Sequence, residues 1–187
     1  GQTLVARREK FFEAFRPSFD AAFATIVDEA GEAPALTYRT SIKDNTPQGW
    51  ATLLQEAREA DLRRGFSTAG AHRDDFRLAV NARQAKYFAS QGQKKSLIAA
   101  LKFAQYQWLA EASGKPPLLL LDDLFDKLDP ARVAALARLL VEQIPGQVFI
   151  TDTSAERLRT AFAPLGEASR SFAYWQVAPS QLDELPG

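Results

Sequence analysis

Four consecutive leucines followed by two aspartates constrain the fold of this chain more than any other feature. Residues 118–121 are a short apolar run of the kind that forms a β-strand buried on both faces of a parallel sheet. Residues 129–143 then show helical spacing after the cap Asp129-Pro130, and residues 148–150 are a second short apolar run. A strand, a helix and a strand in this order predict a parallel sheet with a right-handed crossover, and therefore an α/β fold.

The rest of the chain alternates between helical and extended patterns. Pro17 either kinks the first helix or begins a second one. Asn81-Ala82 is a candidate turn between two short strands. We expect further helices at residues 3–28, 46–64, 90–113 and 154–163, and further strands at residues 35–42, 76–80, 83–89 and 170–177. The helix at 90–113 carries an apolar stripe made of Leu97, Leu101, Ala104, Trp108 and Leu109.

Composition excludes several classes of protein. The 187-residue chain contains no cysteine and no methionine, and 46% of its residues are hydrophobic. A disulfide framework and a cysteine-ligated metal are therefore excluded, and no apolar run reaches the roughly 18 residues of a membrane span. These features indicate a globular domain without membrane association and fit an intracellular, reducing compartment. Because the chain begins with Gly1 and lacks methionine, we also expect it to be a piece of a longer protein.

The net charge is zero, but the basic residues are unevenly distributed. Residues 58–95 carry nine basic and four acidic side chains, a net charge of +5. Such an excess is typical either of a surface that binds phosphates or nucleic acid, or of an ordinary solvated face. Phosphate contacts would make binding independent of sequence and steeply dependent on salt. The candidate DNA contacts are Arg63, Arg64, Arg73, Arg77, Arg83 and Lys86, with Arg58, Lys94 and Lys95 as further candidates.

The expected helix at 90–113 opens with a candidate anion site, which consists of Ser90, Gln91, Gly92 and Gln93. The free N–H groups and positive dipole end of a helix N-terminus attract anions, and Gly92 lets a phosphate approach the backbone. Lys94 and Lys95 lie in the first turn, where the dipole disfavours cations, and a bound anion would offset that cost. A serine cap with a neighbouring glycine explains the same residues without any ligand.

Acidic residues directly follow the leucine run. Open α/β sheets bind ligands at the carboxyl ends of their strands, so Asp122 is a candidate Mg²⁺ ligand and Asp123 a candidate for orienting an attacking water. Two solvated aspartates at a strand end explain the same pattern. Asp126 and Asp129 follow a few residues later, and Asp129 also caps the next helix.

The order and spacing of these motifs resemble the second half of an ABC-type ATPase head, as in the SMC and Rad50 proteins. Residues 70–76 (Gly-Ala-His-Arg-Asp-Asp-Phe) and 88–96 (Phe-Ala-Ser-Gln-Gly-Gln-Lys-Lys-Ser) resemble the RecF family of bacterial recombinational-repair ATPases in particular. Residues 125–129 (Phe-Asp-Lys-Leu-Asp) also fit that family. The resemblance implies the C-terminal half of an ABC ATPase head at residues 65–187, with a parallel sheet and flanking helices, preceded by a mainly helical lobe at residues 1–64.

The resemblance also implies a nucleotide site that is shared between two copies. Ser90, Gln91, Gly92 and Gln93 would contact ATP held by the other copy. Asp122 would bind Mg²⁺, and Asp123 would be the catalytic carboxylate. Asp126 and Asp129 would lie on the D-loop, which faces the second copy and contributes to the same nucleotide site.

The function implied by this resemblance is ATP-dependent dimerisation on DNA, with a role in recombinational repair, replication-gap repair and the SOS response. The implied partners are DNA at gaps or single-stranded/double-stranded junctions, a second copy of the chain, and other recombination-mediator proteins that support recombinase loading. The implied location is the cytoplasm of a bacterium, in association with the nucleoid.

Three features depart from the family pattern or stay open. No Gly-x-x-x-x-Gly-Lys-Ser/Thr phosphate loop occurs in the sequence, so we expect this chain alone to bind ATP weakly and not to hydrolyse it. We expect that loop in an amino-terminal portion of the parent protein. Asp152 stands where many ABC heads place a histidine. His72 is the single histidine, and we interpret it as structural, with Arg73 and Asp74 hydrogen-bonded around it.

Two other functions fit the same residues. A non-hydrolysing module that binds DNA or a partner protein needs no phosphate loop. Another SMC- or Rad50-like ATPase head would carry a long coiled coil between its two halves, and the short region before the motif at 90–93 lacks sustained heptads.

Overall fold

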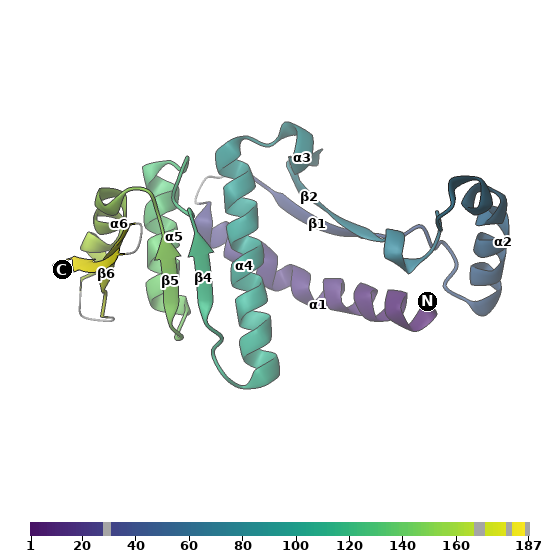
Figure 1. The fold of residues 1–187 in the computed structure, drawn as a ribbon, viewed down its shortest axis with the longest axis horizontal. Helices are drawn as coiled ribbons and strands as arrows, with labels where there is room; N and C mark the ends of the chain where they lie inside the picture. Colours follow the sequence, from purple (N-terminus) through teal and green to yellow (C-terminus); the bar gives the residue numbers. More distant parts are fainter. Residues whose placement is uncertain (28–30, 167–170, 179–180, 186–187) are drawn as a thin grey trace.

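The computed structural model describes residues 1–27, 31–166, 171–178 and 181–185, and Figure 1 shows an elongated molecule. Its helices are α1 (Gln2–Ile26), α2 (Pro47–Arg64), α3 (Ala85–Phe88), α4 (Gln91–Ser113), α5 (Pro130–Gln143) and α6 (Ala155–Phe162), with 3-10 turns at Ala71–Arg73 and Ala163–Leu165. Its strands are β1 (Pro34–Arg39), β2 (Asp75–Val80), β3 (Arg83–Gln84), β4 (Leu119–Asp122), β5 (Val148–Thr151), β6 (Tyr174–Ala178) and β7 (Gln181–Leu185).

The described strands form three small sheets. β1, β2 and β3 make an antiparallel sheet, and β6 pairs with β7 in a second antiparallel sheet. β4 and β5 are parallel neighbours connected through α5, with Leu119 opposite Val148 and Asp122 opposite Thr151. The predicted strand-helix-strand unit and α/β fold class are therefore confirmed.

The core lies where α1 crosses α4 and α5 (Figure 1). Phe19 and Phe23, four residues apart on α1, are 0% and 1% exposed, because this spacing places them on one face of a helix. Phe103 on α4 and Leu136 on α5 belong to the same buried cluster. α1 runs through Pro17 without a break, so the alternative of a second helix starting there is wrong. The end predicted for this helix, residue 28, lies outside the described residues.

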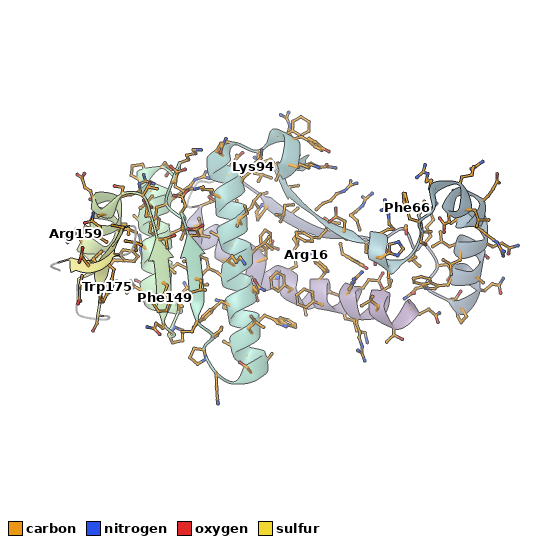
Figure 2. All side chains as sticks on the ribbon, viewed as in Figure 1. Arg16, Phe66, Lys94, Phe149, Arg159 and Trp175 are labelled. Carbon is orange, nitrogen blue, oxygen red and sulfur yellow. The ribbon has the colours of Figure 1, made fainter. Side chains whose placement is uncertain are left out.

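One face of β4 is exposed, which contradicts the prediction that residues 118–121 are buried on both faces. Leu119 and Leu121 are buried, whereas Leu118 and Leu120 are 64% and 69% exposed. Phe149, the register partner of Leu120 on β5, is 51% exposed (Figure 2). The structure therefore has a second apolar sheet face that the described part of the chain leaves uncovered.

Residues 83–89 do not form the predicted strand. β3 ends at Gln84, and residues 85–88 turn into the short helix α3, whose end is marked by a hydrogen bond from the Ala89 N–H to the Ala85 carbonyl. A strand would alternate buried and exposed side chains, but three consecutive residues of α3, Lys86, Tyr87 and Phe88, are exposed. In α4, Leu109 is 47% exposed and therefore falls outside the apolar stripe predicted there.

A buried carboxylate ties the β1–β2 sheet to the first turns of α1. Asp74 has a side chain that is 1% exposed. Its Oδ2 accepts hydrogen bonds from the Tyr38 hydroxyl on β1 and from Arg8 Nη1 on α1 at 3.0 Å. Burial, followed by the hydrogen bond to Asp74, raises the pKa of Tyr38 above its usual value, so this phenol stays protonated and donates.

Contacts cross the boundary predicted between residues 1–64 and 65–187. β1 pairs with β2 along their whole length, and α1 packs against α4. By contrast, α2 is placed at one extreme of the molecule, far from the parallel sheet (Figure 1). The division into two units at residue 64 stays a prediction.

Candidate functional site

Two aspartates lie at the carboxyl end of β4, as expected for a ligand-binding edge. Thr151 at the end of β5 donates its hydroxyl hydrogen to Asp122 Oδ1. The next residue, Asp123, leaves the strand with a positive φ of 49°, and its N–H bonds the Thr151 carbonyl at 3.0 Å. The left-handed conformation is uncommon for residues other than glycine. The chain therefore turns sharply between the two carboxylates. For this reason we expect Asp122 and Asp123 to have different roles.

Lys95 connects the first turn of α4 with these carboxylates. Its Nζ donates to the Asp123 carbonyl at 2.7 Å and lies 3.6 Å from Asp123 Oδ2 and from Asp126 Oδ2. The anion that we expected to offset a lysine in this turn is therefore provided by the protein itself. Lys95 is thus already matched by groups of the protein, and its contact with a phosphate or with DNA stays a prediction.

A second cation holds Asp126 from the opposite side. Arg157 Nη1 on α6 lies 3.7 Å from Asp126 Oδ1 and 3.6 Å from Asp152 Oδ2. The Asp152 side chain is fully buried, and its other oxygen accepts the Ser154 N–H at 2.8 Å. Asp152 thus faces an arginine, so its charge is compensated within the protein. Whether it replaces a histidine stays open.

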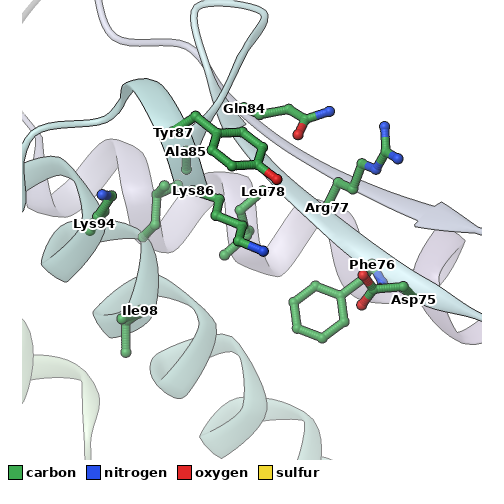
Figure 3. A pocket seen from close by; sticks show the side chains of 11 residues that line it. Asp75, Phe76, Arg77, Leu78, Gln84, Ala85, Lys86, Tyr87, Lys94 and Ile98 are labelled. Atoms are coloured by element: carbon green, nitrogen blue, oxygen red, sulfur yellow. The ribbon is translucent and has the colours of Figure 1, made fainter.

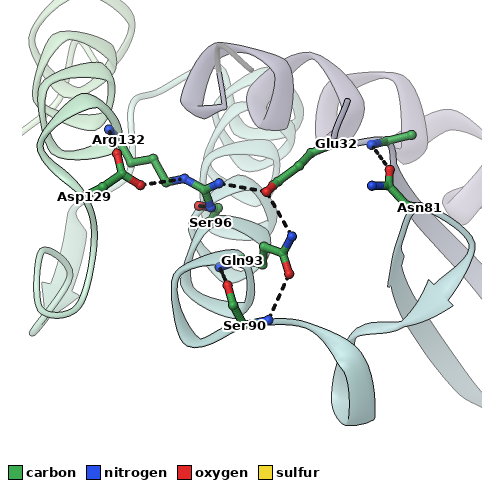
Figure 4. A network of polar contacts seen from close by, with 8 residues as sticks. Glu32, Asn81, Ser90, Gln93, Ser96, Asp129 and Arg132 are labelled. Carbon is green, nitrogen blue, oxygen red and sulfur yellow. Dashed lines mark hydrogen bonds and ion pairs between the residues drawn. The ribbon is translucent and has the colours of Figure 1, made fainter. Parts of the chain in front are cut away.

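The predicted anion site is a tightly capped turn, which we call the signature turn (residues 90–93, Figure 4). Ser90 Oγ accepts the Gln93 N–H at 3.1 Å, and Gln93 Oε1 accepts the Ser90 N–H at 2.9 Å, a capping box. Gln91 is exposed. A Cβ atom on Gly92 would lie 3.6 Å from the Lys127 carbonyl, so the signature turn is adjacent to the D-loop (residues 126–129).

Arg132 and Glu32 are residues that sequence reasoning missed. Arg132 Nη2 lies 2.9 Å from Glu32 Oε1, and both side chains are nearly buried, at 11% and 13% exposure. Arg132 also reaches Asp129 Oδ2 at 3.0 Å and Ser96 Oγ at 3.1 Å. Asp129 caps α5, as predicted, through the Arg132 N–H. Glu32 and Arg132 are 100 positions apart in the sequence, so no local pattern could have revealed the pair.

Some of the predicted DNA contacts line one hollow, which we call the basic groove (Figure 3). It has a volume of about 410 Å³ between β2, α3 and α4. Within the described residues, none of its three basic side chains has an ion-pair partner. The residues that define it are Arg77, Lys86 and Lys94, with the exposed apolar side chains Phe76, Tyr87 and Ile98.

The other predicted DNA contacts are scattered. Arg63 and Arg64 occupy the last turn of α2 at the far end of the molecule, and Arg63 pairs with Glu59 at 2.9 Å. Arg73 lies in the 3-10 turn before β2. Arg83 on β3 lines a different hollow, together with Gln93. The structure does not bring these four side chains into one surface with Arg77 and Lys86.

His72 does not have the partners that we predicted. Its Nε2 lies 3.1 Å from the Ser67 carbonyl oxygen. Asp74 is instead bound by Arg8 and Tyr38. The prediction that Arg73 and Asp74 surround the histidine is therefore wrong, although His72 does stabilise the turn after α2.

The described residues lack two kinds of feature. None of the helices there combines the length and apolar character that a membrane crossing requires. No group of three or more histidine, cysteine or carboxylate residues lies in a position to hold a metal ion, again within the described part of the chain.

The sequence is similar to curated bacterial proteins described as DNA replication and repair protein RecF. It is 38% identical over 172 residues to that of Azobacteroides pseudotrichonymphae, covering 92% of this chain and 46% of that protein. It is 33% identical over 184 residues to that of Bacteroides fragilis strain YCH46, covering 98% and 49%. The chain therefore spans about half the length of these relatives. No family model matches it.

The fold is shared with solved structures of ATPase heads. A structure of the recombination mediator protein RecF with ATP matches with a TM-score of 0.71 at 20% identity, covering 100% of this chain and 47% of that chain. An SMC ATPase structure matches with a TM-score of 0.51 at 16% identity, covering 100% and 90%. The chain is therefore similar in sequence to about half of RecF, and its fold matches the RecF and SMC structures.

Proposed function

We propose that this chain is the signature-bearing part of a RecF-like, DNA-binding ATPase. The observation that carries the proposal is the contact between three motifs. From the first turn of α4, Lys95 reaches Asp126 on the D-loop at 3.6 Å and donates to the Asp123 carbonyl at the end of β4, while Gly92 lies next to the D-loop. Motifs that are separated by about thirty residues in sequence therefore form one continuous surface.

In the proposed site, the signature turn contacts the γ-phosphate of ATP that a second copy holds. Ser90 and Gly92 supply a hydroxyl and close backbone approach, and Gln91 and Gln93 flank them. Asp126 and Asp129 lie on the D-loop next to this turn. ATP bound between the two copies would then draw them together, which is the basis for ATP-dependent dimerisation.

The two aspartates of β4 divide the remaining chemistry. Asp122 is exposed and leaves one oxygen free of Thr151, and Mg²⁺ commonly binds through one or two carboxylates while keeping several waters. The residues present therefore fit the ion, which when bound would neutralise developing phosphate charge. Asp123, whose Oδ1 accepts no hydrogen bond although it is buried, is the proposed group that orients the attacking water.

For DNA, we propose the basic groove as the main contact. Unpaired cations neutralise phosphates without reading sequence, and an exposed aromatic ring such as Tyr87 offers a surface for stacking an unpaired base. This combination favours gaps and single-stranded/double-stranded junctions. We further propose a role in bacterial recombinational and replication-gap repair at the nucleoid, with recombination-mediator proteins and support of recombinase loading, because the curated relatives are described as replication and repair proteins.

The experiment joins this chain to the phosphate-loop half of a RecF relative in a chimera. Light scattering measures its mass with and without ATP and Mg²⁺, and a second assay measures its ATP hydrolysis. We expect an ATP-dependent dimer that hydrolyses ATP. Ser90→Arg should abolish the dimer. Asp123→Asn should keep the dimer and lower turnover by about 100-fold or more, a typical loss for a group that acts on the proton of the attacking water. Arg138→Met, on the exposed side of α5, is the matched control.

Equal turnover of Asp123→Asn and the parent chimera, or no ATP-dependent dimer in either, would contradict the ATPase proposal. DNA binding that persists in that case would favour the alternative of a non-hydrolysing interaction module. The SMC- or Rad50-like alternative has less support, because the curated relatives that match in sequence are RecF proteins.

A further inference from the structure

Arg132 is the most heavily engaged side chain near the candidate site. Three of its nitrogens reach three different segments: Nε lies 3.0 Å from Asp129 Oδ2, Nη1 lies 3.1 Å from Ser96 Oγ, and Nη2 lies 2.9 Å from Glu32 Oε1. Only a planar guanidinium presents donors in three fixed directions, whereas a lysine has a single ammonium. The residue therefore joins the D-loop, α4 and the segment before β1.

Glu32 is the second centre of this cluster. Its Oε1 also accepts a hydrogen bond from Gln93 Nε2 at 2.9 Å, while its Oε2 is buried without a hydrogen-bond partner. Gln93 uses its other side-chain atom, Oε1, to cap the Ser90 N–H. One carboxylate oxygen thus holds the signature turn through Gln93 and the D-loop through Arg132 (Figure 4).

Ala33, the residue after Glu32, extends the connection to the β1–β2–β3 sheet beside the basic groove. The Ala33 N–H bonds Asn81 Oδ1 at 2.8 Å, and the Asn81 N–H bonds the Ala33 carbonyl at 2.8 Å. Asn81 begins the turn between β2 and β3, which leads through α3 back to Ser90. The contacts therefore close a ring that includes the signature turn, Glu32 and both strands beside the groove.

We propose that Arg132 is a positioning residue that, together with Glu32, holds the signature turn, the D-loop and the β2–β3 turn as one rigid unit. Its function is to fix the signature turn and D-loop relative to each other and to transmit displacement of either one to the basic groove. The inference rests on the proposed function in one respect, the assignment of the two segments to nucleotide and of the groove to DNA. The mechanical coupling itself does not depend on it.

The first test measures amide hydrogen exchange in this chain, without any ligand. Arg132→Met removes the central cation, Glu32→Gln/Arg132→Met removes both charges, and Arg138→Met is the control on the same helix. Removing one partner of a nearly buried ion pair is strongly destabilising, whereas removing both partners is often close to neutral. The double variant therefore separates loss of position from loss of stability.

We expect residues 90–96 and 126–129 to exchange together at least about tenfold faster in the double variant, while its unfolding midpoint in urea stays near that of the parent. Arg138→Met should change neither. Restored protection in the double variant would mean that the pair acts through stability alone and would overturn the proposal. Faster exchange in residues 126–129 without residues 90–96 would overturn it as well, because Arg132 would then serve the D-loop only.

The second test adds a single-stranded oligonucleotide. In the parent chain, binding in the groove should slow exchange in residues 126–129, and in the double variant it should not. Equal slowing in both would contradict transmission through this cluster. If the oligonucleotide does not bind to the parent chain at all, the DNA assignment fails, while the ligand-free exchange still decides the proposal.

Discussion

Two neighbouring lysines mark the difference between the carboxylate cluster after β4 (Asp123 and Asp126) and the basic groove. Lys95 donates to Asp123 and pairs with Asp126, while Lys94 lies in the groove beside Arg77 and Lys86 without an ion-pair partner in the described part of the chain. At the first site every cation of the cluster is already matched by a carboxylate. At the second, the cations face solvent.

This contrast separates two uses of positive charge. A paired, partly buried cation fixes the geometry of the loops around it, and its loss reduces stability. An unpaired cation on an open groove contributes little to folding and is available to phosphate. Five predictions test this difference, beginning with the largest expected effect.

The largest effect is expected for Arg132→Met. Glu32 would then be left as a nearly buried, uncompensated charge, so the free energy of unfolding should fall by about 3 kcal/mol. Arg138→Met on the exposed side of α5 should change it by less than about 0.5 kcal/mol. Urea denaturation followed by circular dichroism measures both. Similar values for the two variants would remove the distinction between matched and free cations.

The second prediction concerns Asp74, the buried carboxylate that joins the β1–β2 sheet to α1. Asp74→Asn should lower the free energy of unfolding by about 2 kcal/mol, because the charged hydrogen bonds from Arg8 and Tyr38 lose their ionised acceptor. Asp75→Asn, one residue further and exposed, is the matched control. A stability loss that is equal in both variants would show that the exposed carboxylate matters as much as the buried one.

The third effect concerns the exposed ring in the groove. Tyr87→Ala should weaken binding of single-stranded DNA by about tenfold, because stacking contributes about 1–3 kcal/mol for each base, and it should leave duplex binding unchanged. Phe66→Ala removes an exposed ring near α2, outside the groove, and should have no effect (Figure 2). Fluorescence anisotropy with both kinds of DNA provides the comparison. An equal loss for duplex and single strand would exclude stacking.

Substitutions of Lys94 and Lys95 should have smaller effects, one on the salt dependence of DNA binding and the other on stability. Lys94→Gln should reduce the slope of log affinity against log salt by about one, without a change in stability. Lys95→Gln should leave that slope unchanged and lower the free energy of unfolding by about 1 kcal/mol, since it removes a hydrogen bond to the Asp123 carbonyl. If both variants change the slope, the assignment of Lys95 to structure is wrong.

The smallest expected effect is on the pH dependence of stability, and it concerns Asp61, which lies outside both the carboxylate cluster and the basic groove. Hydrogen bonds from the Thr68 hydroxyl and N–H lower the pKa of Asp61. A lowered pKa stabilises the folded state above the ordinary carboxyl pKa, and this contribution is lost as the pH falls through the lowered value. Asp61→Asn should therefore be less stable than the parent near neutral pH, with a difference that disappears in acid. A difference that grows in acid would contradict this sign.

Local signals predicted most of the secondary structure. The caps at Ser90 and Asp129 are short-range patterns, and both are present. The strand-helix-strand unit followed from apolar runs of the right length. In contrast, α3 was missed because residues 83–89 follow a candidate turn and contain the strand-favouring Tyr87 and Phe88, whereas residues 83–86 are good helix formers. The exposure of Leu120 was also missed, since a run of leucines does not reveal whether one face of its strand lacks a neighbour.

The candidate site was predicted as a set of motifs but not as a structure. Sequence spacing placed Asp122 and Asp123 at a strand end, and the order of the motifs along the chain suggested that they meet. The pairing of Glu32 with Arg132 depends on contacts between distant segments, which leave no periodicity in one sequence. For the same reason, Lys94 and Lys95 could not be assigned to different roles before their surroundings were known.

The uncovered face formed by Leu118, Leu120 and Phe149 has a consequence for the behaviour of this chain in solution. Attraction between such faces comes mainly from the release of water near room temperature and weakens on cooling. Samples should therefore be most monodisperse when they are cold and dilute, and warming or adding sulfate should promote reversible clustering. Handling temperature thus becomes an experimental variable for this molecule.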